Sequence, residues 1–161
     1  MTERWVINAS PLILLGKAGQ LSWLPELGEL VIPQAVADEI MAGSEDDSAR
    51  QWLAFGKGKT FVTPDAPVPS ELGAWDLGSG ETSVLAWAIR QGNYEAILDD
   101  SAARRCALVF GVPVRGTLGL VVLAKRRGFI TKCRPVFASL TTSGLFITRD
   151  LLEQAAIAAG E

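Results

Sequence analysis

Residues 5–17 read WVINASPLILLGK, and the order of residue types in this stretch indicates the fold. Trp5-Val6-Ile7 is a short apolar run typical of a buried strand, and Asn8 is a polar residue at its end. The residues from Pro11 to Lys17 have helical character, with Ser10 as the expected N-cap and Pro11 at the first helical position. A strand followed at once by a helix is the repeating unit of an α/β fold.

The same order of a short apolar strand and a helix recurs along the chain. Further strands are predicted at 30–32, 61–62, 96–98 and 112–114, with a short apolar segment at 145–147. Further helices are predicted at 33–41, 48–55, 80–90, 101–110, 118–127 and 135–140 and from residue 150, whereas 63–80 reads as a loop rich in Pro and Gly. This alternation favours an α/β fold with a mainly parallel central sheet. The length of 161 residues predicts one domain, spanning residues 1–161.

The composition limits the chemistry that the chain can perform. Hydrophobic residues make up 48% and charged residues 20% of the sequence, which is a globular composition. There is no histidine, so Ser-His-Asp catalysis, Cys-His catalysis and histidine-bound zinc are excluded. Two cysteines argue against a disulfide scaffold and a four-cysteine zinc site. Oxygen-ligated hard metals are therefore the natural class of cofactor.

No stretch has the pattern of a targeting signal or a membrane span, because the longest apolar run, Leu118 to Ala124, is too short. We therefore expect a cytoplasmic protein with reduced thiols and no membrane association. Cys106 lies in an apolar helix and is expected to be buried. The cations Lys132 and Arg134 beside Cys133 predict a lowered pKa for its thiol.

The charges are divided unevenly along the chain. Residues 1–100 hold 6 basic and 15 acidic side chains, whereas residues 101–149 hold 9 basic and no acidic ones. A basic stretch of this length indicates either a surface that faces a polyanion or cations that neutralise acidic neighbours in the fold.

Polar side chains stand where an open parallel sheet binds ligands, beyond the carboxyl ends of its strands. Asn8 follows the first strand, and Asp99 and Asp100 follow a later one. Glu39 and Glu81 lie on helices with apolar flanks. If the strands are neighbours and these side chains converge, they form an oxygen-only site for Mg²⁺ or Mn²⁺, which activates water and stabilises charge on a phosphoryl group.

Each of these residues also has a purely structural explanation. Asn8 can hydrogen-bond the loop at the strand end, and Glu81 suits the positive end of a helix dipole. Glu39 can belong to a solvated helix face, and one of Asp99 and Asp100 can cap a helix. A phospho-acceptor site of the receiver type is disfavoured, because the aspartate pair follows a late strand rather than the first.

Other polar residues have two interpretations as well. Ser10 and Thr117 can cap helices or supply hydroxyls to the site. Arg104 and Arg105 follow the aspartates by about one helical turn, where they can contact phosphate or pair with acidic neighbours. The remaining candidate contacts to an RNA backbone are Arg115, Lys125 and Arg126.

Blocks along nearly the whole chain, in order, resemble PIN-domain proteins. The first two are residues 6–13 (VINASPLI) and 31–40 (VIPQAVADEI). Four more resemble a poorly characterised prokaryotic PIN branch, namely 77–86 (LGSGETSVLA), 98–104 (LDDSAAR), 116–119 (GTLG) and 124–130 (AKRRGFI).

This resemblance implies a three-layer α/β/α fold and, as in many members, a metal-dependent ribonuclease that uses Mg²⁺ or Mn²⁺. It implies an acidic cluster at Asn8, Glu39, Glu81 and the pair Asp99 and Asp100, with Asp100 favoured as the last acid. Many bacterial members are VapC-type toxins, so a cognate antitoxin and a homodimer are implied too.

The sequence departs from the family pattern at Asn8, where nuclease-active members usually have an aspartate. An amide offers a carbonyl oxygen to a metal but carries no charge, so metal affinity should fall. Two hypotheses follow, a ribonuclease and a catalytically weakened PIN-fold module that binds RNA or a protein.

Overall fold

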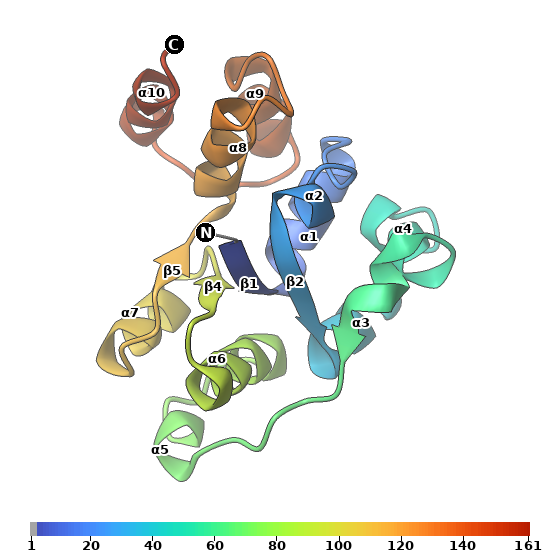
Figure 1. The fold of residues 1–161 in the computed structure, drawn as a ribbon, viewed down its shortest axis with the longest axis vertical. Coiled ribbons are helices and arrows are strands. Elements are labelled where there is room, and N and C mark those ends of the chain that lie inside the picture. The colour runs from blue at the N-terminus through green and yellow to red at the C-terminus, as the bar shows by residue number, and fades with distance from the viewer. Residues whose placement is uncertain (1–2) are drawn as a thin grey trace.

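A parallel sheet lies at the centre of the structure, a computed structural model that describes residues 3–161 (Figure 1). Within these residues its five strands are β1 Glu3–Ile7, β2 Gly28–Pro33, β3 Val62–Thr63, β4 Glu95–Ile97 and β5 Val114–Arg115. They pair in the order β3-β2-β1-β4-β5, and every pairing is parallel. The predicted parallel sheet is therefore confirmed.

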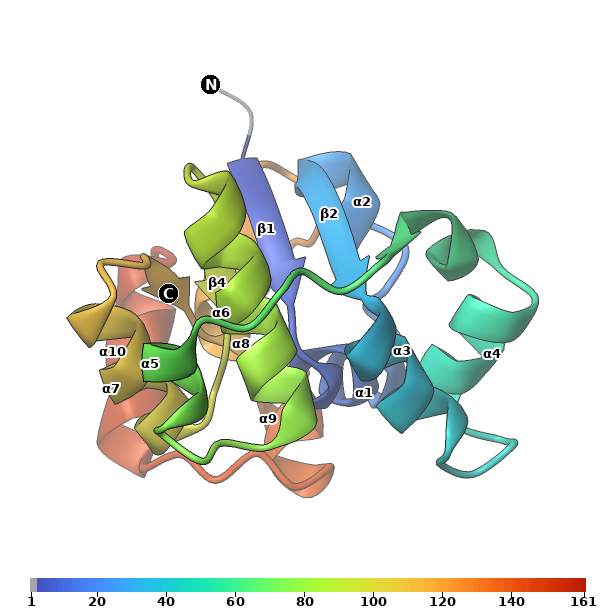
Figure 2. The same cartoon turned by 90° about the horizontal axis from the view of Figure 1, so that it is seen from below.

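Helices cover both faces of this sheet. Those in residues 3–161 are α1 Ala9–Lys17, α2 Leu24–Leu27, α3 Gln34–Met41, α4 Ser48–Ala54, α5 Ser70–Gly73, α6 Ser79–Gln91, α7 Ser101–Val109, α8 Thr117–Arg126, α9 Arg134–Thr142 and α10 Arg149–Ala158, with a 3₁₀ turn, η1, at Lys57–Phe61. Helix α6 lies against one face, and α1 and α8 lie against the other (Figures 1 and 2). The result is the expected three-layer α/β/α fold. No helix of these residues is long and apolar enough to cross a membrane.

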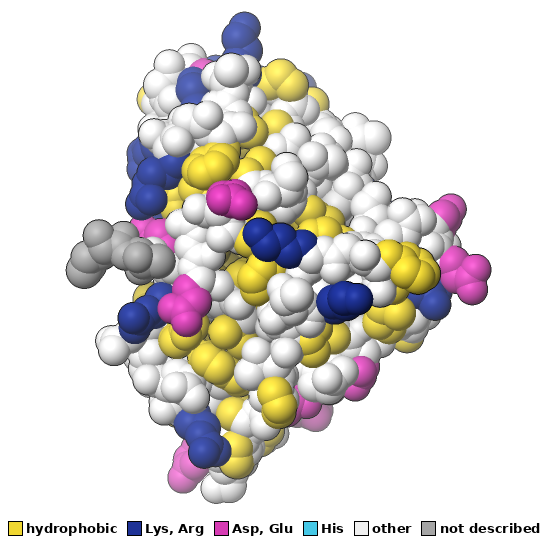
Figure 3. Space-filling model, turned by 45° about the vertical axis from the view of Figure 1, so that its right-hand side comes forward, with side chains coloured by type: hydrophobic (Ala, Val, Ile, Leu, Met, Phe, Trp, Pro, Cys, Tyr) yellow, Lys and Arg dark blue, Asp and Glu magenta, His cyan; other side chains and the backbone are white. Residues whose placement is uncertain are grey.

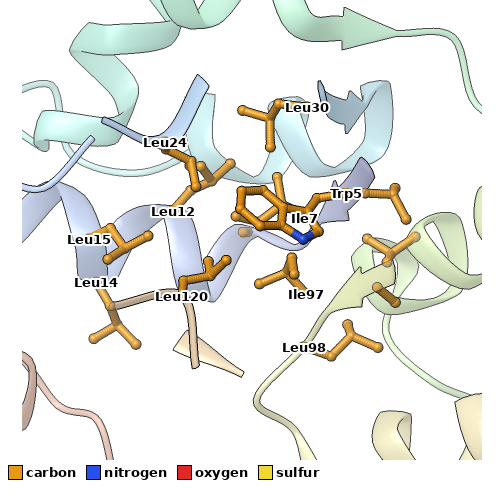
Figure 4. Packing of buried hydrophobic residues seen from close by; sticks show 14 of the residues in the cluster. Trp5, Ile7, Leu12, Leu14, Leu15, Leu24, Leu30, Ile97, Leu98 and Leu120 are labelled. Atoms are coloured by element: carbon orange, nitrogen blue, oxygen red, sulfur yellow. The ribbon is translucent and has the colours of Figure 1, made fainter. Parts of the chain in front are cut away.

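The central strand, β1, forms the middle of the core. Trp5, Val6 and Ile7 are fully buried, as expected for a parallel strand covered on both faces. Figure 4 shows the Trp5 ring among leucine and isoleucine side chains from strands and helices. The Trp5 indole N–H donates to Glu95 Oε1 (3.0 Å), and Arg115 Nε donates to the same oxygen (2.8 Å). The Glu95 carboxylate therefore links β4 to both of its neighbours, β1 and β5.

The chain changes its direction across the sheet between β1 and β4. From β1 it moves outward through β2 to β3, and from β4 it moves the other way to β5. Ile7 lies opposite Ile97, and the Asn8 backbone N–H extends this pairing by donating to the Ile97 carbonyl (3.2 Å). Open α/β sheets bind ligands at such a reversal, beyond the carboxyl ends of the strands. The ends of β1 and β4, which precede Asn8 and Asp99, are therefore neighbours, as the predicted metal site requires.

Most predicted elements lie within a few residues of the observed ones, and the differences have local causes. Helix α1 begins at Ala9 with Asn8 at the N-cap position, so the predicted N-cap role of Ser10 is wrong. The short apolar segment at 145–147 lies in the connection between α9 and α10 and has no regular secondary structure. Helix α5 forms inside the predicted loop, directly after Pro69, whose φ of −60° suits the start of a helix.

The carboxylate of Glu161 anchors the last helix to α8 and α9. It accepts hydrogen bonds from Lys125 Nζ (2.9 Å) and from the backbone N–H groups of Cys133 (2.5 Å) and Arg134 (3.3 Å). Because α9 begins at Arg134, this side chain caps α9 from a distant part of the chain. The hydrogen bonds and the Lys125 charge lower the pKa of Glu161 to about 2.

The pKa of the Cys133 thiol differs from the sequence-based prediction. Cys133 is fully buried, and its Sγ lies 3.7 Å from the Val121 carbonyl oxygen. Burial, followed by the negative charge of Glu161, raises the pKa of the Cys133 thiol to about 11. The predicted lowering is wrong because the thiol lies in the core, while neighbouring Arg134 pairs with Glu153.

The Glu161 anchor predicts a pH-dependent stability. The folded-state pKa lies near 2, below the usual glutamate value of about 4.3. The charged carboxylate therefore stabilises the fold above about pH 4.5, and this contribution is lost as the pH falls toward 2. We expect E161Q to unfold at a lower urea concentration than the wild type at pH 7, with a smaller difference at pH 3. Circular dichroism follows both titrations.

The exposed Glu71 provides the control, E71Q, which should leave the urea midpoint unchanged. A gap between E161Q and wild type that stays constant from pH 7 to pH 3 would contradict the assigned role of the carboxylate charge.

Candidate active site

A pocket of about 510 Å³ lies beyond the carboxyl ends of β1 and β4. Six side chains that the sequence singled out line it together, namely Asn8, Ser10, Glu39, Glu81, Asp99 and Asp100. Ile13, Leu14 and residues 143–146 complete the lining. The acidic residues are far apart in the sequence, and the strand order brings them to one place.

Two helices carry glutamates toward Asn8. Helix α3 follows β2 and holds Glu39, and α6 packs against the sheet with Glu81 in its first turn. Asn8 is only 3% exposed, and its Nδ2 lies 3.4 Å from Glu81 Oε1, to which it donates. The buried Asn8 Oδ1 has no hydrogen-bond partner among residues 3–161. A buried oxygen without a partner costs free energy, so this atom points to a cation or water.

Gly80 allows these oxygen atoms to approach α6. A Cβ atom at this position would lie 2.9 Å from Asn8 Oδ1 and 3.1 Å from Glu39 Oε1. Both distances are shorter than an ordinary van der Waals contact, so a larger residue would displace the oxygens. Asn8 Oδ1 and Glu39 Oε1 therefore lie close to the same point on the first turn of α6.

The pocket concentrates negative charge. Four carboxylates line it, from Glu39, Glu81, Asp99 and Asp100, and the described lining contains no Lys or Arg. Partial burial raises the pKa of Glu39, and the charge of Glu81 raises it further. The raised pKa means that the pocket disfavours the charged form of Glu39. A bound cation would favour that charged form, which makes the pocket a place for positive charge.

The two aspartates both cap helices. Asp99 Oδ1 accepts from the Thr117 backbone N–H (2.9 Å) and Asp99 Oδ2 accepts from the Thr117 hydroxyl (2.6 Å), at the start of α8. Asp100 is the N-cap of α7 and accepts from the Ala103 N–H (2.9 Å). Thr117 is fully buried, so it holds Asp99 instead of lining the pocket. The sequence explained only one of the pair as a cap, whereas the structure gives both this role.

The oxygen donors of the pocket fit a hard divalent cation. Asn8 Oδ1 and the carboxylates of Glu39 and Glu81 lie at one end of the pocket, with Asp99 and Asp100 also on its wall. Within residues 3–161 no three Asp, Glu, His or Cys side chains are close enough to enclose an ion by themselves. The Asn8 amide oxygen and water would have to complete the shell, which suits Mg²⁺ because it retains several waters in proteins.

Most candidate RNA contacts in the basic stretch have partners within the fold. Arg115 pairs with Glu95, Lys125 pairs with Glu161, and Arg126 donates to the Ala158 carbonyl. The exposed face in Figure 3 likewise has basic and acidic side chains interspersed. Four of the nine cations of residues 101–149, namely Arg115, Lys125, Arg127 and Arg134, therefore pair with carboxylates of the described chain.

Arg104 lies beside the acidic pocket. Arg104 is exposed and donates from Nη1 to the Leu98 carbonyl (3.1 Å), which keeps it beside the aspartates. Arg105 is exposed on the same helix, α7. Arg104 lines a second cleft that shares Asp99 with the acidic pocket.

Asp65 supports the site, although sequence analysis did not single it out. Its Oδ1 accepts from the Ala35 backbone N–H (3.1 Å) at the start of α3 and from the hydroxyl of buried Ser83 (2.5 Å) on α6. These two helices carry Glu39 and Glu81. Asp65 therefore links the helices that position both glutamates. It lies in a loop without periodicity, so only the folded structure shows this contact.

The Asp65 link predicts a coupled loss of stability. D65A removes the acceptor for a buried hydroxyl and for a helix N–H, so we expect a loss of about 1–3 kcal/mol in the free energy of unfolding. S83A removes the donor and should lose less. If the hydrogen bond is the cause, the double variant is less destabilised than the sum of the two single variants. Urea denaturation of all four proteins measures this coupling, and strict additivity would exclude it.

The chain was compared with known protein families and with curated proteins. A family model described as a PIN domain matches residues 4–161. No curated protein matches the chain.

Proposed function

We propose that this chain, which belongs to the PIN-domain family, is a metal-dependent ribonuclease. In this proposal it hydrolyses RNA phosphodiesters with Mg²⁺ or Mn²⁺ bound in the acidic pocket. The observation that supports this proposal best is the composition of the pocket. Four carboxylates and Asn8 line a space whose described lining contains no basic side chain, and the buried Asn8 Oδ1 has no hydrogen-bond partner among residues 3–161. A polyanion such as RNA can approach this charge only when a cation offsets it.

In this proposal the residues of the pocket have different roles. Asn8, Glu39 and Glu81 hold the cation, together with Asp100 or Asp99, which line the same pocket. A divalent cation supplies Lewis-acid stabilisation of the phosphate and makes a bound water more acidic. The carboxylates of Glu39 and Glu81 are the groups available to accept a proton from the attacking water. Thr117 keeps Asp99 in place through its two hydrogen bonds.

RNA contacts are assigned to the cations nearest to the pocket. Arg104 and Arg105 are exposed on α7, directly after the aspartates, where they can bind backbone phosphates. We assign Arg115, Lys125 and Arg126 to the fold, because each has an internal partner. Ser10 lines the pocket and is a candidate to hydrogen-bond the substrate phosphate.

The family resemblance extends the proposal to a toxin that a cognate antitoxin neutralises and that acts as a homodimer. Leu108 and Val109 are adjacent and exposed on α7, and we assign the partner contact to this apolar surface. Light scattering after gel filtration measures the molar mass in solution. A mass of two chains would support the homodimer, and a mass of one chain would exclude it.

The ribonuclease proposal predicts cleavage that depends on both the metal and the acidic pocket. The purified protein should cleave a fluorescently labelled RNA with Mn²⁺ or Mg²⁺ and should stop when EDTA is added. E81Q should lower the cleavage rate by more than about 100-fold. This exceeds the largest loss usual for a residue that only hydrogen-bonds to a metal ligand. The matched control E71Q should cleave like the wild type. Cleavage that persists at full rate in both EDTA and E81Q would exclude this site.

The alternative, a weakened PIN-fold module that binds RNA or a protein, rests on Asn8. Its neutral amide donates to Glu81, so the pocket holds one negative charge fewer than an aspartate would give. A weaker field lowers the affinity for a cation. In this alternative the wild type binds its partner without turnover.

N8D distinguishes the two functions. The substitution adds a carboxylate beside Glu81, so we expect a lower melting temperature without metal and a larger Mn²⁺-induced increase than in the wild type. Differential scanning fluorimetry measures both effects. A wild type that cleaves RNA supports the ribonuclease, whereas cleavage that appears only in N8D supports the weakened module. If N8D leaves the Mn²⁺ response unchanged, Asn8 is not a ligand.

A further inference from the structure

A second cleft adjoins the acidic pocket. It has a volume of about 660 Å³ and shares Asp99, Leu145 and Phe146 with the pocket. Helices α7, α8 and α10 supply its other walls. A ligand bound in the acidic pocket can therefore continue into this cleft past Phe146.

Phe146 is the most exposed of the large apolar side chains in the described chain, at 98% exposure. The residues on both sides of it are anchored. Leu145 is buried and donates its N–H to the Leu140 carbonyl (3.0 Å), and Ile147 packs against the core. The loop is therefore held on each side of a ring that remains in solvent. An exposed phenylalanine between two clefts differs from a scattered surface residue, because both clefts use it as a wall.

The second cleft differs from the acidic pocket in chemistry. Leu118, Ile147 and Leu151 give it apolar walls, while Arg104 and Gln154 offer hydrogen-bond donors. Asp99, on the shared border, is its only acidic side chain among the described lining residues. An apolar surface with a cation at its edge suits a nucleobase attached to a phosphate, because the base stacks and the phosphate pairs with the arginine.

We propose that Phe146 stacks on the nucleobase next to the phosphodiester in the acidic pocket. This proposal rests on the proposed ribonuclease function. Stacking on a protein ring needs a base that is free to leave its neighbours, and bases in a duplex are not. Arg104 then holds the phosphate on the far side of that base. Phe146 thus contacts the base, whereas the acidic residues act on the phosphodiester.

The experiment separates base stacking from backbone binding. The probes are a fluorescein-labelled ten-nucleotide oligoadenylate and the same backbone with all bases removed. Fluorescence anisotropy with Ca²⁺, with intact probe verified on gels, gives the dissociation constants of wild type, F146A and F146W. F55A is the matched control, because Phe55 is also exposed (87%) but lines a different cleft.

We expect F146A to bind oligoadenylate about 5- to 100-fold more weakly than the wild type, the range for the loss of one stacked base. It should bind the baseless backbone like the wild type, F146W should restore binding to oligoadenylate, and F55A should match the wild type for both probes. Because Phe146 is in solvent, F146A should also keep the wild-type melting temperature.

The outcomes keep this proposal separate from the function on which it rests. If the wild type cleaves RNA with Mn²⁺ but F146A binds oligoadenylate like the wild type, the stacking role is wrong and the ribonuclease stands. Equal weakening of F146A for both probes also excludes stacking. If the wild type neither cleaves RNA nor binds either probe, both proposals fail.

Discussion

The parallel pairing of β1 with β4 determines where the acidic side chains meet. Ile7 lies opposite Ile97, and the Asn8 N–H continues the ladder to the Ile97 carbonyl. Because both strands end at the same level, Asn8 and the aspartate pair stand on one edge. Helix α3, which follows the neighbouring β2, and α6, which packs across the sheet, then bring the two glutamates to this edge. Asp65 links these two helices and so fixes the distance between their carboxylates.

The site gathers charge that the fold does not neutralise. Elsewhere several charged side chains form ion pairs, as with Arg115 and Glu95 or Lys125 and Glu161. The pocket instead holds four carboxylates and an unpartnered amide oxygen without a described basic neighbour. Two of these carboxylates are held by caps of α7 and α8, which stabilises their positions in the absence of an ion. The remaining pair, Glu39 and Glu81, is the part of the pocket that a cation would affect most.

Much of this arrangement could be predicted from the sequence, because it rests on local patterns. Short apolar strands followed by helices indicated the parallel sheet, and the absence of histidine left oxygen ligands as the natural choice for a metal site. The acidic residues were found because each follows a strand or stands on a helix with apolar flanks. Other features depend on contacts between distant segments. The adjacency of β1 and β4, the bonds from Asp65 to Ala35 and Ser83, and the place of Phe146 between two clefts have no local sequence signal.

The basic stretch and Cys133 show what local composition cannot decide. Cations at 101–149 indicated either a surface for a polyanion or cations that neutralise acidic neighbours, and several of them pair with acidic residues that lie far away in the sequence. Cys133 has basic neighbours in the sequence, but burial and the Glu161 carboxylate set the pKa of its thiol. In both cases the partner comes from tertiary packing.

Anomalous difference density from crystals grown with Mn²⁺ would show directly whether the acidic pocket holds a cation. We expect a peak within ligand distance of Asn8 Oδ1 and of the carboxylates of Glu39 and Glu81. An empty pocket at millimolar Mn²⁺, or a peak that none of these oxygens contacts, would contradict this expectation.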